Sequence, residues 1–193
     1  AQDSALEHAR KAADRAVLAD TNDPWASIGR GYVSIVSREG DAAIMNYGRA
    51  VDLAPNFAYA RALLGVSNAY AGNADLARIH ITKAIALSPR DTFLDKFYLY
   101  LAVAEFQAAN YDAAVEAAER AIQMKPGHPS SHLFRTGALA HSGRQDEAER
   151  ACAAYLELVP TARSSKIERT VLYYRAEDRA RIAEGLRIAG LPN

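Results

Sequence analysis

The chain has 193 residues, half of them hydrophobic, and its 23 Lys and Arg residues balance its 23 Asp and Glu residues. The hydrophobic share excludes wholesale disorder. The lack of a basic excess argues against a nucleic-acid partner, because phosphate neutralisation supplies much of that affinity. No apolar run approaches the roughly 20 residues that a membrane span needs, so no membrane partner is expected.

The single cysteine, Cys152, cannot form an internal disulfide, which favours a reducing, cytoplasmic location. No charged segment followed by an apolar one marks a signal peptide. A periplasmic location stays open as an alternative, because Ala1-Gln2 is also compatible with a freshly cut export terminus.

From the N-terminus onward, small residues recur in two columns seven positions apart. The columns are Ala9, Ala43, Ala77, Ala114 and Ala148, and Ala16, Ala50, Ala84, Ala121 and Tyr155. Prolines keep the same step at Pro55, Pro89, Pro126 and Pro160, with intervals of 34, 37 and 34 residues. Three columns that move in phase indicate an internal repeat of helical pairs, in which each unit buries its apolar face against the next.

Each repeat is expected to hold two helices. The first carries a small residue midway, such as Gly31 or Gly65, and ends at a turn signal such as Ala71-Gly72-Asn73. The second carries the two alanine columns and stops before its proline, which cannot continue a helix. Small side chains let the neighbouring helix axes approach closely.

In chain order, residues 1–23 form the second helix of a truncated unit, and a non-repeat tail of about two helices covers 163–193. Four units lie between them, at 24–57, 58–91, 92–128 and 129–162. The third unit has three extra residues, which we assign to a longer first helix over 93–108. Because the chain opens within a repeat, it is expected to be a fragment of a longer protein.

The 34-residue period, the small pairs Gly31/Ala43 and Gly65/Ala77, the aromatic Tyr47 and the closing prolines resemble the tetratricopeptide repeat (TPR) family over most of the chain. The resemblance implies an all-α solenoid, a right-handed superhelix of antiparallel helix pairs, here followed by a C-terminal helical tail. One departure is Thr21, which stands where the truncated unit would have its closing proline.

Two segments carry a narrower resemblance. Residues 86–91 (ALSPRD) and 182–192 (IAEGLRIAGLP) are similar to segments of bacterial class III adenylate/guanylate cyclase-like regulatory proteins. In those proteins a C-terminal TPR array follows a cyclase or DNA-binding domain. The resemblance implies a regulatory or assembly arm, with any catalytic residues upstream of this chain.

The chain offers little catalytic or metal-binding chemistry. His128 and His132 are four residues apart, but Pro129 places His128 before the helix and no third ligand is evident. Cys152 occupies a core column, and Gly29-Arg30-Gly31 follows no strand, unlike a phosphate loop. We therefore expect no catalytic residue, no metal and no cofactor, and a small enzyme with an unrecognised site is the alternative.

The tail is basic, with seven Lys and Arg residues against four Asp and Glu residues between 163 and 187. A solvated helix face with ion pairs along the helix explains this excess. Contact with an acidic partner or with phosphates is the alternative.

In the TPR family, first helices line a concave groove that receives a peptide or a helix. The residues that match by register, and that recur at three- to four-residue spacing, are Trp25, Ile28, Tyr32, Val36, Tyr59, Val66 and Tyr70. One interpretation is that they pack the core or cover a missing helix. The other is an aromatic-rimmed groove for a partner. Ile28 and Tyr32 replace residues with which chaperone-binding TPR domains clamp a terminal carboxylate.

The sequence thus predicts a protein-interaction or assembly module without catalysis of its own, within a larger signalling protein. Its partner is a protein or peptide, and a homodimer is the second expectation. The rival within the same fold is an arm that dimerises or positions a cyclase or a transcriptional regulator.

Overall fold

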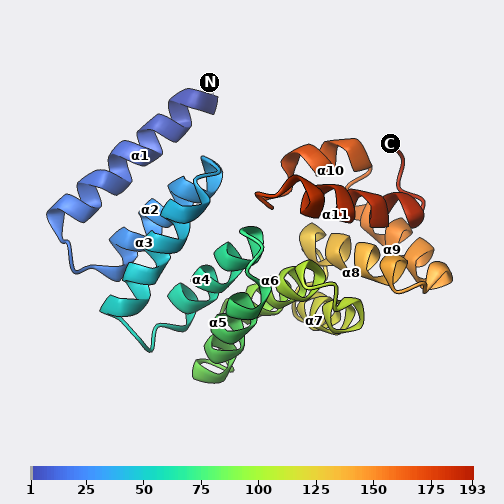
Figure 1. Cartoon of the computed structure of the whole chain (residues 1–193), viewed down its shortest axis with the longest axis horizontal. Helices are drawn as coiled ribbons and strands as arrows, with labels where there is room; N and C mark the ends of the chain where they lie inside the picture. The colour runs from blue at the N-terminus through green and yellow to red at the C-terminus, as the bar shows by residue number, and fades with distance from the viewer. Residues whose placement is uncertain (1) are drawn as a thin grey trace.

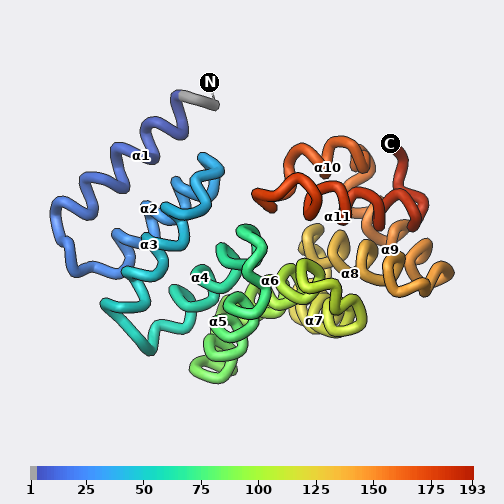
Figure 2. Tube along the Cα trace, viewed as in Figure 1, coloured from blue at the N-terminus to red at the C-terminus, as the bar shows by residue number. Residues whose placement is uncertain are grey.

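The computed structural model describes residues 2–193, with side chains from Ser4 onward, and this part of the chain is entirely helices and turns. The helices follow one another along a curved arc (Figure 1, Figure 2). Their bounds are α1 (Gln2–Ala19), α2 (Pro24–Val36), α3 (Gly40–Leu53), α4 (Ala58–Tyr70), α5 (Ala74–Leu87), α6 (Leu94–Gln107), α7 (Tyr111–Met124), α8 (Pro129–His141), α9 (Gln145–Leu158), α10 (Ser164–Thr170) and α11 (Ala176–Ile188).

The helices stack as antiparallel pairs. Helix α2 packs against α3, α4 against α5, α6 against α7 and α8 against α9, and each pair packs on the next in chain order. Ala43, Ala77, Ala114 and Ala148 have no exposed surface. At the matching site of the first helices, a Cβ on Gly31 would overlap the Tyr47 ring. The all-α solenoid predicted from the repeat is confirmed, and small residues are what bring its helices together.

Proline ends the second helix of every pair in the same way. The residues just before the four prolines, Ala54, Ser88, Lys125 and Val159, all have φ between −142° and −136° and ψ between 75° and 82°. A residue before proline is pushed out of the helical region by the proline ring. The chain therefore leaves each hairpin in one fixed direction, which keeps successive pairs in register.

The three extra residues of the third unit do not all lengthen its first helix, so that prediction is wrong. Helix α6 has 14 residues, against 13 in α4. The connection before it spans residues 88–93, whereas the connection before α4 spans 54–57. The Asp91 carboxylate accepts the Phe93 N–H at 2.9 Å, and the Asp91 N–H donates to Ser88 O at 3.1 Å. These local bonds hold two of the three residues in a turn.

The tail turns back over the array. Helix α11 packs against α8 and α10, and Figure 1 shows the tail returning toward the middle of the arc. Between α10 and α11 the Tyr174 N–H donates to the Tyr70 carbonyl at 2.9 Å. The tail thus joins the fourth unit to the end of the second.

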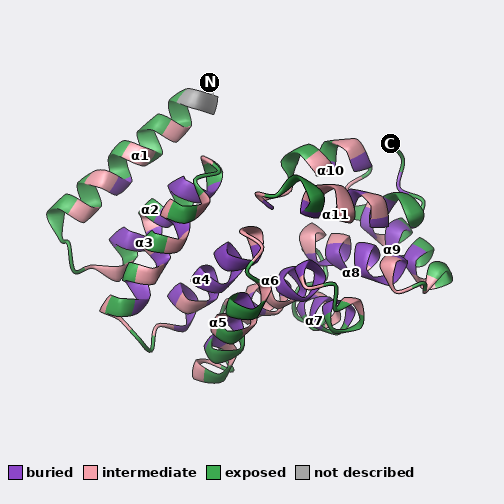
Figure 3. Cartoon of the chain, viewed as in Figure 1, coloured by how far each residue is buried: buried purple, intermediate pink, exposed green. Residues whose placement is uncertain are grey.

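Burial follows this packing, with buried faces where helices meet and a largely exposed α1 (Figure 3). Among the described helices, none combines the length and apolarity needed to cross a membrane.

Candidate protein-binding surface

The predicted stripe on α2 divides between surface and core. Trp25, Tyr32 and Val36 are 54%, 40% and 62% exposed, whereas Ile28 is 2% exposed. Ile28 therefore belongs to the core and cannot contact a partner in this conformation. The first three remain candidates for such a contact.

On α4 the stripe is mostly covered. Val66 is 2% exposed and lies in the core. Tyr59 is 7% exposed, and its ring stacks on Phe93 with centroids 4.6 Å apart. The Tyr59 hydroxyl is hydrogen-bonded to the Tyr32 hydroxyl. Val66 is therefore a core residue rather than a groove residue. Tyr59 is buried and holds the exposed Tyr32 in place through the hydrogen bond between their hydroxyl groups.

Tyr70, the last residue of the stripe, is covered by the tail. Its ring meets Tyr173 edge-on at 5.8 Å and Tyr174 at 6.3 Å. Sequence reasoning missed this contact, although two glycines signal it. A Cβ on Gly40 would lie 2.6 Å from the Tyr174 ring, and one on Gly72 would lie 2.7 Å from Cζ of Arg175. Only glycine lets the tail approach these turns so closely.

The tail also occupies the face of α6 and α8 that continues the stripe. The Tyr173 hydroxyl donates to Val103 O at 2.7 Å, and Arg181 donates to Gln107 O at 2.9 Å. A Cβ on Gly137 would lie 2.5 Å from Cδ1 of Ile182. The C-terminal half of the predicted groove is therefore filled by the chain itself.

The N-terminal half contains an open apolar hollow of about 750 Å³ between α1 and α2, which we call the α1–α2 hollow. Its walls are almost wholly apolar and include three exposed alanines of α1, and Tyr32 and Val36 stand on the α2 side. The lining residues are Ala5, Leu6, Ala9, Ala12, Ala13, Gly29, Tyr32, Val33 and Val36.

The alanines of α1 are exposed although their counterparts in the repeat are buried. Ala9 and Ala16 are exposed, whereas Ala43 and Ala50, the same two columns in α3, are fully buried. In every later unit a first helix covers this face, and among the described residues 2–193 no first helix of its own unit lies against α1. The α1–α2 hollow is thus the place where the repeat geometry puts a helix.

Polar contacts hold α1 in position beside the hollow. Arg10 pairs with Glu39 at 2.9 Å, and Arg30 pairs with Asp14 at 3.0 Å. Burial, followed by the hydrogen bond to Tyr59, raises the pKa of the Tyr32 hydroxyl above its ordinary value, at which the group is already neutral at physiological pH. Neutral Tyr32 and the apolar wall suit an uncharged, largely apolar ligand surface.

The residues weighed for catalysis or metal binding lie apart from this hollow. His132 contacts Pro126 O through Nε2 at 2.7 Å, and burial lowers the pKa of His128. Burial also raises the pKa of Cys152, which makes its thiolate scarce at neutral pH. Within the described residues no group of three His, Cys, Asp or Glu side chains is placed to hold a metal ion.

These features define the class of fold, which is a TPR solenoid. Its N-terminal end has an exposed apolar surface, and its tail folds over the rest of the array. In agreement with it, residues 99–163 match the tetratricopeptide-repeat sequence family. The search of curated protein sequences gave no match.

Three solved structures illustrate the likeness in fold. PilW, described as a widely conserved type IV pilus biogenesis factor, superposes with a TM-score of 0.77 and 14% identity, over 96% of this chain and 84% of that one. PilF from Pseudomonas aeruginosa gives 0.69 and 17%, over 95% and 82%. YrrB, described as a TPR protein with an unusual peptide-binding site, gives 0.60 and 20%, over 92% and 90%.

Proposed function

We propose that this chain is a protein-docking module, and that the α1–α2 hollow receives an amphipathic helix of a partner protein. The observation that carries this proposal is the exposure of Ala9 and Ala16, whose repeat counterparts are buried beneath a first helix in every later unit. Covering such a face removes apolar surface from water, which stabilises a complex by roughly 25 cal/mol per Å².

The repeat itself supports the shape of the helix. First helices in this chain have 13 or 14 residues, so a partner helix of that length would cover the exposed face of α1. Where the second helix carries a large residue, such as Ile81, the first helix opposite carries glycine, as at Gly65. The α1 residue in that column is Ala13, which leaves room for a side chain larger than glycine on the partner.

Exposed residues of α2 would hold the partner. Tyr32 and Val36 line the hollow, and Trp25 is exposed on the same helix outside the lining. Aromatic side chains bury a large area and lose little conformational entropy on binding, as in many interface hot spots. Of the seven residues predicted for the groove, we propose these three as partner contacts.

A displayed library of 13-residue amphipathic helices, selected on the folded chain, tests the proposal. Ala9→Arg fills the hollow with a charged side chain, so selected helices should lose at least about tenfold in affinity. Ala153→Arg is the matched control, because Ala153 is exposed on α9 and lines no wall of the hollow. Helices that bind the Ala9→Arg variant as well as the wild type would refute this site.

The narrower signalling role rests on the resemblance of residues 86–91 and 182–192 to cyclase-like regulatory proteins. As the alternative function we propose an arm that dimerises or positions an upstream domain. In the dimer, a second copy of this chain would cover the same α1–α2 hollow. Sedimentation of the isolated chain separates the two functions. A concentration-dependent dimer that Ala9→Arg dissociates supports the arm, and a monomer at all concentrations excludes it.

A further inference from the structure

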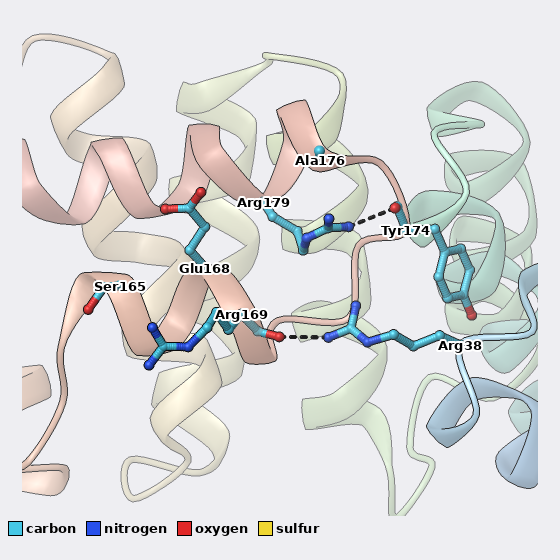
Figure 4. A pocket seen from close by; sticks show the side chains of 7 residues that line it. All are labelled: Arg38, Ser165, Glu168, Arg169, Tyr174, Ala176 and Arg179. Atoms are coloured by element: carbon cyan, nitrogen blue, oxygen red, sulfur yellow. Dashed lines mark hydrogen bonds between the residues drawn. The ribbon is translucent and has the colours of Figure 1, made fainter.

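A second hollow, of about 690 Å³, lies where the tail meets the first unit (Figure 4). We call it the tail hollow. Its walls come from the turn between α2 and α3, from α10 and from the start of α11. The lining residues are Arg38, Ser165, Glu168, Arg169, Tyr174, Ala176 and Arg179.

Positive charge dominates this hollow. Three of its residues are arginines and one is a glutamate, which leaves a formal charge of 3 − 1 = +2. Among the side chains described from Ser4 onward, no carboxylate lies within 4 Å of Arg38, Arg169 or Arg179, although eight other arginines form such pairs. In Figure 4 the Glu168 carboxylate and the Arg169 guanidinium group both point away from the Arg38 and Arg179 guanidinium groups, which face the centre of the view.

Two of the arginines are held in place by main-chain carbonyls. One terminal nitrogen of Arg38 donates to Arg169 O at 2.9 Å. One terminal nitrogen of Arg179 donates to Tyr173 O at 2.9 Å and to Tyr174 O at 2.7 Å. A guanidinium group has five N–H donors, so each arginine keeps further donors for a ligand while its side chain is already ordered. Ordering before binding lowers the entropic cost of capturing an anion.

The backbone at Arg38 does not favour an arginine. Its φ is 58°, in the left-handed region, and the equivalent turn residues Gly72 and Gly143 have φ of 91° and 77°. A non-glycine residue there costs about 1–2 kcal/mol. Ala109 takes the same conformation at its own turn, with φ of 60°, so the strain alone does not indicate a function. What distinguishes Arg38 is that its side chain reaches the tail hollow.

A helix terminus adds to the positive field. Helix α11 begins at Ala176 in the wall of the hollow, and its N-cap residue, Arg175, makes no side-chain capping bond. The N-terminal end of a helix carries a partial positive charge and free N–H groups. Glu177 and Asp178 in the first turn offset part of this charge, so the arginines remain the main attraction.

We propose that the tail hollow binds a phosphate dianion, an activity that goes beyond the docking of a protein at the α1–α2 hollow. The residual charge of +2 matches the charge of roughly −2 that a phosphate group carries near pH 7. Arg38 and Arg179 are the main ligands and hold the phosphate oxygens through their unused N–H groups, and Arg169 adds charge from α10. Free phosphate and a phosphorylated side chain share this chemistry.

Calorimetric titration of the full chain with inorganic phosphate, at low ionic strength, tests the site. Arg38→Gly removes one guanidinium group and relieves the backbone strain, so the variant should fold and its Kd for phosphate should rise about tenfold. Arg179→Gln should do the same. Ala109→Gly relieves the same strain at the equivalent turn, where φ is 60°, and Arg90→Gln removes an arginine outside the hollow. Both controls should bind phosphate as the wild type does.

A parallel titration with N-acetyl-phosphoserine amide distinguishes the two sources. Tighter binding than that of inorganic phosphate, lost in Arg38→Gly, assigns the site to a phosphorylated partner. Equal or weaker binding, also lost in Arg38→Gly, assigns it to free phosphate. The proposal is overturned if neither probe gives saturable heat, or if Arg38→Gly and Arg179→Gln bind as tightly as Arg90→Gln.

Discussion

Gly31 and Gly48 are both helical, yet their surroundings differ completely. A Cβ on Gly31 would overlap the Tyr47 ring, which is fully buried, whereas a Cβ on Gly48 would meet nothing within 4 Å. We expect Gly31→Ala to lower the free energy of unfolding by about 1–3 kcal/mol through overpacking. Gly48→Ala should raise it by about 0.4–1 kcal/mol, because alanine restricts the unfolded chain. Urea denaturation of both variants measures the difference, and equal effects would show that the close approach at Gly31 is unimportant.

His80 couples stability to pH. Burial, and secondarily the charge of Arg61, lowers the pKa of His80 in the folded chain, and its buried Nδ1 has no hydrogen-bond partner among the described atoms. The unfolded chain therefore binds more protons below the unfolded pKa of about 6.5, and stability falls as the pH drops through that value toward the folded pKa.

We expect His80→Gln to lose less stability than the wild type between about pH 7 and pH 5, because it removes this linkage. Unfolding midpoints in urea at several pH values report the loss. Exposed His8 provides the control variant, His8→Gln. An acid dependence that is unchanged in His80→Gln would assign the effect to other groups, including His128, whose pKa is also lowered.

At the scale of helices, local pattern predicted most of the solenoid. The alanine columns and the pre-proline stops act within one or two neighbouring helices, so they can be read from spacing alone. The same spacing could not separate Ile28 and Val66, which are buried, from Trp25 and Val36, which are exposed. On a short helix with neighbours on several sides, a stripe of apolar residues marks core and groove alike.

The periodicity of the sequence could not predict that the tail folds back over the array. Several of the tail's contacts join residues 70 or more positions apart, such as Tyr173 with Val103 and Arg38 with the Val171 carbonyl. No repeat dictates these pairs, because each occurs once. Within the N-terminal units, the sequence signals these contacts only through two glycines, Gly40 beneath Tyr174 and Gly72 beneath Arg175. Glycine is common at turns for other reasons, so it does not predict the contacts by itself.

One buried carboxylate anchors the last helix. Asp178 is 1% exposed and accepts bonds from Arg175 at 2.7 Å and from Arg181 at 2.6 Å. Removal of one partner from a buried ion pair typically costs about 3–5 kcal/mol, because the remaining charge is left uncompensated. We expect Asp178→Ala to destabilise the tail by less than this range, because the two arginines left without a partner are partly exposed to solvent.

Hydrogen exchange resolved by residue measures the effect of Asp178→Ala, with faster exchange expected from α10 to α11 and little change in α3. Glu184→Ala is the matched control, because Glu184 pairs with Arg187 near the surface, where an ion pair contributes little. Equal exchange in the two variants would mean that apolar contacts alone hold the tail.

At the scale of the molecule, the tail changes what kind of solenoid this is. An open repeat array is quasi-one-dimensional, since each unit contacts only its neighbours. Here Arg38 in the first unit bonds to Arg169 O in the tail, 131 residues away, and the Tyr70 carbonyl of the second unit accepts from Tyr174. These bonds close the arc. The α1–α2 hollow lies at one end of it, and the tail hollow lies at the point of closure.

Closure should make unfolding of the array more cooperative, and Tyr173 is the residue that tests it. Tyr173 is fully buried between Tyr70 and Phe134, so Tyr173→Ala should cost about 3–5 kcal/mol and release the tail from the first two units. We expect its urea transition to broaden or to split in two, because the N-terminal units then unfold independently of the rest. Val115→Ala, a buried change in α7 away from the tail, should shift the midpoint while the transition stays single. A single sharp transition in Tyr173→Ala would mean that stacking between neighbouring pairs, without the closing tail, already couples the whole chain.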